Sequence, residues 1–150
     1  DQQVDIFEWV LHRILTKELY GHFIAPSRSN GNIASLKRLT TELHMLISVI
    51  ATCGIANPQT QDTAFTRGWK LLQPNKPKNF KTVEYFDYEA FNQALAKLRE
   101  LKPKLKASVL EACIQTALAD GTLTQDQFAL IKGIGATLDC PIPPLASKPR

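Results

Sequence analysis

The sequence has few residues of the kinds that build disulfide, metal or redox sites. It contains three cysteines and three histidines among 150 residues. Cys53, Cys113 and Cys140 are odd in number, widely spaced and surrounded by apolar residues, and no C-x-x-C pair occurs. This pattern argues against a disulfide framework or a zinc ribbon, and it favours reduced, buried thiols in a cytosolic setting.

Motifs for catalysis are also missing. His12, His22 and His44 form no H-E-x-x-H, and no carboxylate stands at ligand spacing from them. There is no G-x-S-x-G, and the glycine pair Gly133 and Gly135 lies inside a helical pattern instead of following a strand. A metal site formed by the three histidines, if the fold brings them together, stays open as an alternative. The sequence otherwise predicts no catalytic residue and no cofactor in this chain.

A long hydrophobic run and an initiator methionine are absent as well. The longest apolar run, residues 45–56, includes Ser48 and Thr52 and is too short to cross a bilayer. The chain begins at Asp1, and its only methionine is Met45. Because a translation product begins with methionine, we expect the chain to be a piece of a longer protein.

Helical periodicity, in contrast, extends along most of the chain. Apolar content of 44% and charged content of 21% are typical of a folded globular chain, and the length fits one domain. Apolar residues recur at spacings of three and four in six segments: Val4–Tyr20, Asn32–Ala51, Gln61–Leu72, Tyr88–Leu101, Pro103–Ala119 and Thr124–Leu138. We predict an all-α domain over residues 1–150, with about six helices in an irregular bundle and residues 74–86 as the one place for a loose subdivision.

The predicted second helix carries a seam of apolar residues at alternating spacings of three and four: Leu36, Leu39, Leu43, Leu46, Ile50 and Cys53. Such a seam packs along a neighbouring helix, either within the domain or in a dimer. It spans under three heptads and lacks charged flanks near its end. We therefore interpret it as part of the core.

Glycine and proline mark further features of the predicted helices. Gly68, Gly133 and Gly135 each lower helix stability by about 1 kcal/mol relative to alanine. A closely packed neighbour would offset this cost at Gly68, and we expect another backbone to come close at Gly133 and Gly135. Pro141 ends the last helix, because the residue before a proline is pushed out of the α region. The Pro-rich tail from Pro141 to Leu145 is then predicted to be extended.

The best-defined local pattern is a helical hairpin, two helices joined by a tight turn, around residue 120. Gly121 stands where a helix end needs a left-handed residue, a conformation that costs other residues roughly 1 kcal/mol or more. Thr124 is a suitable N-cap, and Gln127, three residues later, can complete a capping box. The structural role predicted for Asp120 is an Asx turn.

Asp120 is also the one candidate metal ligand in this pattern. An Asp-Gly pair suggests a calcium loop, but an EF-hand needs oxygen ligands two and four residues after the Asp and a closing Glu. Thr122 and Thr124 stand at the first two positions, the glycine follows at once, and the Glu is absent. The turn is therefore the favoured interpretation.

Lysines cluster at two places in a chain with a net charge of +4. The clusters are Lys76, Lys78 and Lys81, and Lys102, Lys104 and Lys106. No recognisable nucleic-acid-binding module accompanies them, which makes nucleic acid an unlikely partner. Ordinary solvated lysines are the favoured interpretation, and a surface of anionic lipids stays open as a partner.

Three runs near the C-terminus together carry a resemblance: Leu110-Glu111-Ala112-Cys113, Ala117-Leu118-Ala119-Asp120-Gly121-Thr122-Leu123-Thr124 and Leu138-Asp139-Cys140-Pro141-Ile142-Pro143-Pro144-Leu145. They resemble the C-terminal segment of bacterial HtpX-like, CAAX-protease-type membrane zinc metallopeptidases. The Asp-Gly helical hairpin alone also resembles the TerB-like domains of tellurite resistance. One departure is Gln127, which stands where a hairpin of this kind usually has Glu.

The resemblance implies a function for the whole chain. In such peptidases the H-E-x-x-H lies upstream, in a separate domain with membrane helices, and zinc is bound there. This chain is then expected to be a non-catalytic accessory domain on the cytoplasmic side of the bacterial inner membrane. Its expected partners are the parent catalytic domain or protein substrates, for docking, substrate engagement or assembly. The alternative is a TerB-like module that binds a cation or a small ligand through Asp120 and neighbouring carboxylates.

Overall fold

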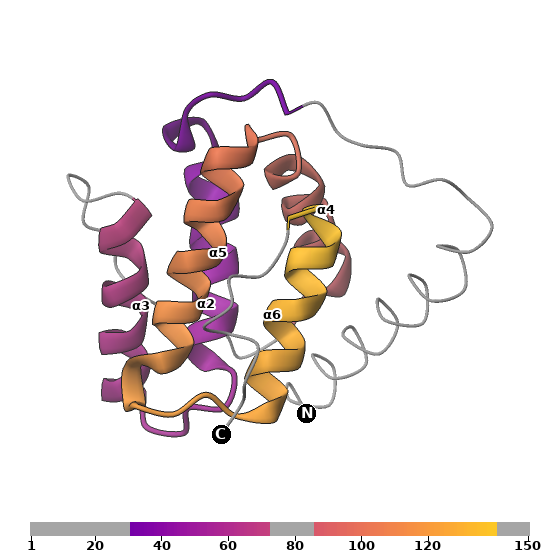
Figure 1. Cartoon of the computed structure of the whole chain (residues 1–150). Coiled ribbons are helices and arrows are strands. Elements are labelled where there is room, and N and C mark those ends of the chain that lie inside the picture. The colour runs from indigo at the N-terminus through magenta and orange to yellow at the C-terminus, as the bar shows by residue number, and fades with distance from the viewer. Residues whose placement is uncertain (1–30, 73–85, 141–150) are drawn as a thin grey trace.

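The computed structural model describes residues 31–72 and 86–140. The elements in these ranges are η1 (Leu36–Leu39), α2 (Thr40–Thr52), α3 (Pro58–Leu72), α4 (Tyr88–Leu98), α5 (Pro103–Ala117), η2 (Leu118–Asp120) and α6 (Gln125–Thr137). Between residues 31 and 140, the described part has no strand beyond one isolated parallel bridge between Ile33 and Leu101. The predicted all-α fold is confirmed (Figure 1).

Several predictions fall outside the described residues. They are the first predicted helix, Val4–Tyr20, with His12 and His22; the lysine cluster Lys76, Lys78 and Lys81; and the Pro-rich tail from Pro141.

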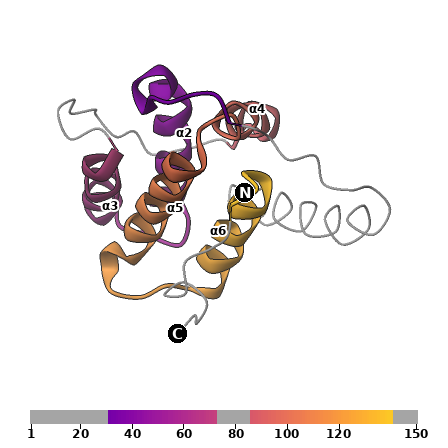
Figure 2. The ribbon, with the colours of Figure 1, turned by 45° about the horizontal axis from the view of Figure 1, so that its top comes forward.

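Helix α5 lies at the centre of the bundle. It contacts α2, α3 and α6, and α2 in turn contacts α3 and α4 (Figures 1 and 2). Its buried residues accordingly cover a broad arc, which includes Val109, Leu110, Cys113 and Ile114. A helix with neighbours on several sides needs such an arc, because each neighbour removes a different stripe from water.

Helices α3 and α5 approach most closely at Gly68. A Cβ atom on Gly68 would lie 1.9 Å from Oγ1 of Thr116 and 3.1 Å from the carbonyl oxygen of Ala112. The closely packed neighbour that would offset the cost of Gly68 is therefore present. Gly133 and Gly135 of α6 are buried.

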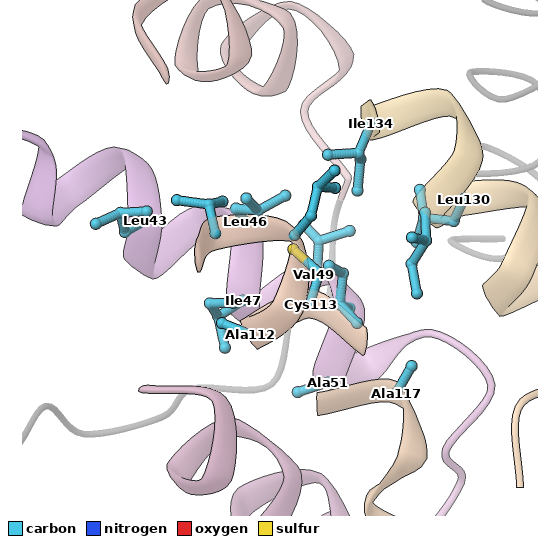
Figure 3. Close-up of a cluster of buried hydrophobic side chains, with 14 of the residues drawn as sticks. Leu43, Leu46, Ile47, Val49, Ala51, Ala112, Cys113, Ala117, Leu130 and Ile134 are labelled. Carbon is cyan, nitrogen blue, oxygen red and sulfur yellow. The ribbon is translucent and has the colours of Figure 1, made fainter. Parts of the chain in front are cut away.

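The apolar seam of α2 packs against the other helices of the same chain. Leu43, Leu46 and Ile50 are fully buried. Figure 3 shows Leu43, Leu46, Ile47 and Val49 gathered with Cys113 of α5 and with Leu130 and Ile134 of α6. The interpretation of the seam as core is confirmed.

Two predicted helix ends were wrong, and the Ile33–Leu101 bridge explains both. The second helix was predicted from Asn32, but residues 32–35 are not helical. The fourth was predicted to reach Leu101 but ends at Leu98. The amide of Ile33 donates to the carbonyl of Glu100 at 2.9 Å, and the amide of Lys102 donates to the carbonyl of Ile33 at 3.0 Å. In these two hydrogen bonds the backbone groups of Ile33, Glu100 and Lys102 pair across the bridge instead of within a further helical turn. Each helix is therefore shorter than predicted.

Helix α3 begins at Pro58, earlier than the predicted Gln61. The side-chain oxygen of Asn57 accepts a hydrogen bond from the amide of Gln59 at 2.8 Å. Pro58 lacks an amide hydrogen, and none is needed in the first turn of a helix. Asn57 and Pro58 therefore start the helix.

Candidate functional site

The hairpin between α5 and α6 turns at Gly121. Its φ of 91° lies in the left-handed region, and its amide donates to the carbonyl of Leu118 at 2.8 Å. No atom lies within 4 Å of a Cβ built at this position, so the backbone angle alone selects glycine. The α-helical part of α5 stops at Ala117 instead of the predicted Ala119, because the last turn tightens into the 3-10 turn η2.

Asp120 has a local hydrogen-bonding role in the turn. Its Oδ1 accepts from the amide of Thr122 at 3.1 Å and from the hydroxyl of Thr122 at 3.4 Å. This is the Asx-turn geometry expected from the sequence. Within residues 31–72 and 86–140, no group of three or more His, Cys, Asp or Glu side chains is arranged to hold a metal ion.

Thr124 and Gln127 form a reciprocal cap at the start of α6. The amide of Gln127 donates to the Thr124 hydroxyl at 3.1 Å, and the amide of Thr124 donates to Oε1 of Gln127 at 2.9 Å. Two of the unpaired donors at the helix N-terminus are thereby satisfied. These are the two bonds of the capping box that the sequence predicts.

Gln127 also makes a long-range bond that the sequence analysis missed. Its Nε2 donates to the carbonyl oxygen of Cys53 at 3.1 Å, and the side chain is 1% exposed. Cys53 is the C-cap of α2, so one amide joins the hairpin to the end of a core helix. A carboxylate has no hydrogen to donate here, whereas an amide has two. The local sequence carried no signal of this contact, because the two residues lie 74 positions apart.

None of the three cysteines forms a disulfide, and burial makes their thiols poor nucleophiles. Cys53 and Cys113 are buried, whereas Cys140 is only half-buried, which corrects the prediction that all three are buried. Burial, with a smaller contribution from Asp126, raises the pKa of Cys53 to about 11. Burial also raises the pKa of Cys113 and of Cys140. All three are therefore protonated at neutral pH.

His44 belongs to an aromatic cluster between α2 and α3. Its ring centroid lies 5.2 Å from that of Phe65 and 6.0 Å from that of Trp69, both in edge-on geometry. Phe65 and Trp69 stack on each other at 5.5 Å. The ring of His44 thus has a packing role at this interface.

The second lysine cluster was predicted to consist of solvated lysines, and for one of the three this is wrong. Lys102 and Lys104 are exposed, but Lys106 is 3% exposed. Lys106 shares a face of α5 with the buried Val109, Leu110 and Cys113, at helical spacings of three and four, so its aliphatic stem is drawn into the bundle. Only two lysines of this cluster remain for a partner.

None of the described helices has both the length and the apolar composition needed to span a membrane. Comparisons with protein-family models, with curated proteins and with solved structures found no match to this chain. The described residues form an all-α domain. Support for a function therefore comes from the residues of this chain alone.

Proposed function

We propose that this chain is a non-catalytic accessory domain of a membrane-bound zinc metallopeptidase. It lies on the cytoplasmic side of the bacterial inner membrane and docks on the parent catalytic domain or on protein substrates. The observation that carries the proposal is the construction of the Asp120–Gln127 hairpin. Residues behind the resemblance to such peptidases build the fold: Asp120 and Gly121 form the turn, and Thr124 caps α6. The partner of Thr124 in the cap is Gln127, the one departure from the resemblance.

The bonding of the hairpin favours a scaffold over a reactive centre. The carboxylate of Asp120 accepts from Thr122, and both polar atoms of the Gln127 amide are bonded, to Thr124 and to Cys53. The Gln127 amide would have to break its bonds to Thr124 and Cys53 before it could bind a ligand, whereas the exposed carboxylate of Asp120 keeps a second oxygen. The outer faces of the helices are then the surfaces that meet the catalytic domain or the substrate.

The proposal is tested by supplying the chain in trans. The catalytic part of the parent peptidase, truncated before residue 1 of this chain, is assayed for cleavage of unfolded casein with and without the separate 150-residue chain. Cleavage should rise when the chain is added, and the chain alone should give none. Chelator-sensitive cleavage of casein by the chain alone would contradict the proposal. Equal cleavage by the catalytic fragment with and without the chain would also contradict it.

The TerB-like alternative makes a different prediction for the same turn. It assigns a cation to Asp120 and its neighbouring carboxylates. Calorimetry with calcium, magnesium and zinc, together with the melting temperature in each salt, separates the two functions. Heat of binding that is lost in Asp120→Asn would favour the cation-binding module.

A further inference from the structure

The exposed cations near the α4–α5 connection form one basic end of the bundle. This end comprises Lys37 and Arg38 of η1, Lys97 in the last turn of α4, and Lys102 and Lys104 at the start of α5. All five side chains are exposed. The bridge between Ile33 and Leu101 joins the segment before η1 to the α4–α5 connection, which brings these cations to the same end of the molecule (Figure 1). The carboxylates closest to these cations in sequence are Glu42 and Glu100, and Glu89 lies in the first turn of α4.

The opposite end of the bundle carries the other sign of charge. It is formed by the end of α2, the start of α3, η2 and the start of α6 (Figure 1). Residues 50–66 and 111–131, which make up this end, contain no lysine or arginine. Asp62, Asp120 and Asp126 are exposed there. The two ends of the described part therefore carry opposite charge, and the electrostatic field will orient the basic end towards a polyanion.

Two of the cations stand where they oppose helix stability. Lys102 is the N-cap residue of α5 and Lys104 lies in its first turn, and this turn has no acidic residue. The N-terminus of a helix carries partial positive charge, so lysines there are unfavourable. Helices α2, α4 and α6 have Glu42, Glu89 and Asp126 in their first turns, whereas α3, like α5, has no acidic residue there. Residues that lower the stability of a helix without a compensating structural benefit, as these two lysines do, are typical of a functional surface.

We propose that the basic end binds the headgroups of anionic phospholipids in the membrane surface. Four of its five cations are lysines, whose point charges suit scattered phosphates better than the planar geometry of base readout. They come from three segments and not from one helix that enters a groove. Tyr88, the exposed aromatic side chain of α4, lies at the far end of that helix from Lys97, so residues 31–72 and 86–140 place no aromatic stacking platform for single-stranded nucleic acid at the basic end.

This surface rests on the proposed function, because an accessory domain of a membrane peptidase lies next to the headgroups. Binding would be electrostatic and reversible, with no apolar insertion. Each lysine near an anionic bilayer changes the partition coefficient by about fivefold. The attraction should weaken as salt shortens the screening length from about 10 Å at 0.1 M to about 3 Å at 1 M.

The test is co-sedimentation of the full 150-residue chain with vesicles. It should bind vesicles that contain phosphatidylglycerol at low salt and should not bind pure phosphatidylcholine. The double variant Lys102→Ala/Lys104→Ala should lower the partition coefficient roughly 25-fold. The matched control, Arg67→Ala/Lys132→Ala, removes the same charge from other exposed positions and should lower it less than about threefold. Melting curves establish that both variants fold.

Several results would overturn the assignment. The first is an equal loss of the vesicle partition coefficient in the two double variants. The second is a loss of vesicle binding only when Lys76, Lys78 and Lys81 are replaced. The third is binding of a duplex oligonucleotide without binding of anionic vesicles. Failure of vesicle binding would remove this surface but leave the outcome of the casein assay unchanged, so the two proposals fail separately.

Discussion

The amide of Gln127 makes the substitution Gln127→Glu an informative perturbation. The change is nearly isosteric and keeps an oxygen for the amide of Thr124. It removes the donor that reaches the carbonyl of Cys53 and places a second oxygen about 3.1 Å from it, at a site that is 1% exposed. The lost bond is worth about 1 kcal/mol, and the uncompensated burial of a charged oxygen adds about 1–3 kcal/mol.

A partial compensation comes from the helix itself. A negative charge in the first turn of α6 is favourable by about 0.3–1 kcal/mol. We therefore expect the free energy of unfolding to fall by about 2–3 kcal/mol at pH 7. For a chain of this length, the melting temperature should fall by about 5–10 °C.

The effect of Gln127→Glu should depend on pH. Burial and the carbonyl of Cys53 disfavour the ionised form, so the pKa of the introduced carboxyl is raised in the folded state above its unfolded value of about 4.3. Below the unfolded pKa the carboxyl is protonated in both states and can donate to Cys53, so the loss of stability is small. The loss grows as the pH rises from the unfolded pKa to the folded pKa and is constant above it.

The assay is urea unfolding followed by circular dichroism at pH 4 and pH 7. Gln125→Glu is the matched control, since Gln125 is exposed in the same helical turn and the chemical change is identical. It should leave stability unchanged or raise it by up to about 1 kcal/mol, because a negative charge in the first turn of a helix is favourable. Equal stability of the two variants at pH 7, or a larger loss for Gln127→Glu at pH 4, would refute the role given to the Gln127–Cys53 bond.

Three further predictions concern the glycines and the thiols. Gly68→Ala should destabilise the fold by about 1–3 kcal/mol despite the better helix propensity of alanine, because the new Cβ meets Thr116; combining it with Thr116→Ala should recover part of the loss in a thermal melt. Gly121→Val should lower stability by more than about 1 kcal/mol, since φ is 91° there, and an unchanged melting temperature would argue against a left-handed turn. A thiol-specific disulfide reagent at pH 8 should modify half-buried Cys140 first, whereas Cys113 should react only at the rate of unfolding; rapid modification of Cys113 in the native protein would contradict its burial.

Features that depend on residues close in sequence were predictable. The turn at Asp120 and Gly121 and the cap formed by Thr124 and Gln127 each involve groups within three residues of one another. Their geometry follows from backbone angles and side-chain lengths. The seam of α2 was predictable for a similar reason, because helical spacing alone assigns its leucines to one face.

Features that depend on packing between distant segments were not predictable. The bond from Gln127 to Cys53 spans 74 residues, and the bridge between Ile33 and Leu101 sets two helix ends from outside both helices. Lys106 is a charged residue whose burial is decided by the neighbours of α5 and not by its own chemistry. The basic end was hidden because its residues come from three separate segments.

The native polypeptide in which this chain occurs provides the most direct test of the proposed function. An antibody against this chain can isolate the native protein from a membrane fraction, and peptide mass spectrometry can identify the sequence upstream of Asp1. The account predicts an upstream H-E-x-x-H between hydrophobic spans in the same polypeptide. An upstream sequence without that motif, or a native polypeptide that consists of these 150 residues alone, would contradict it.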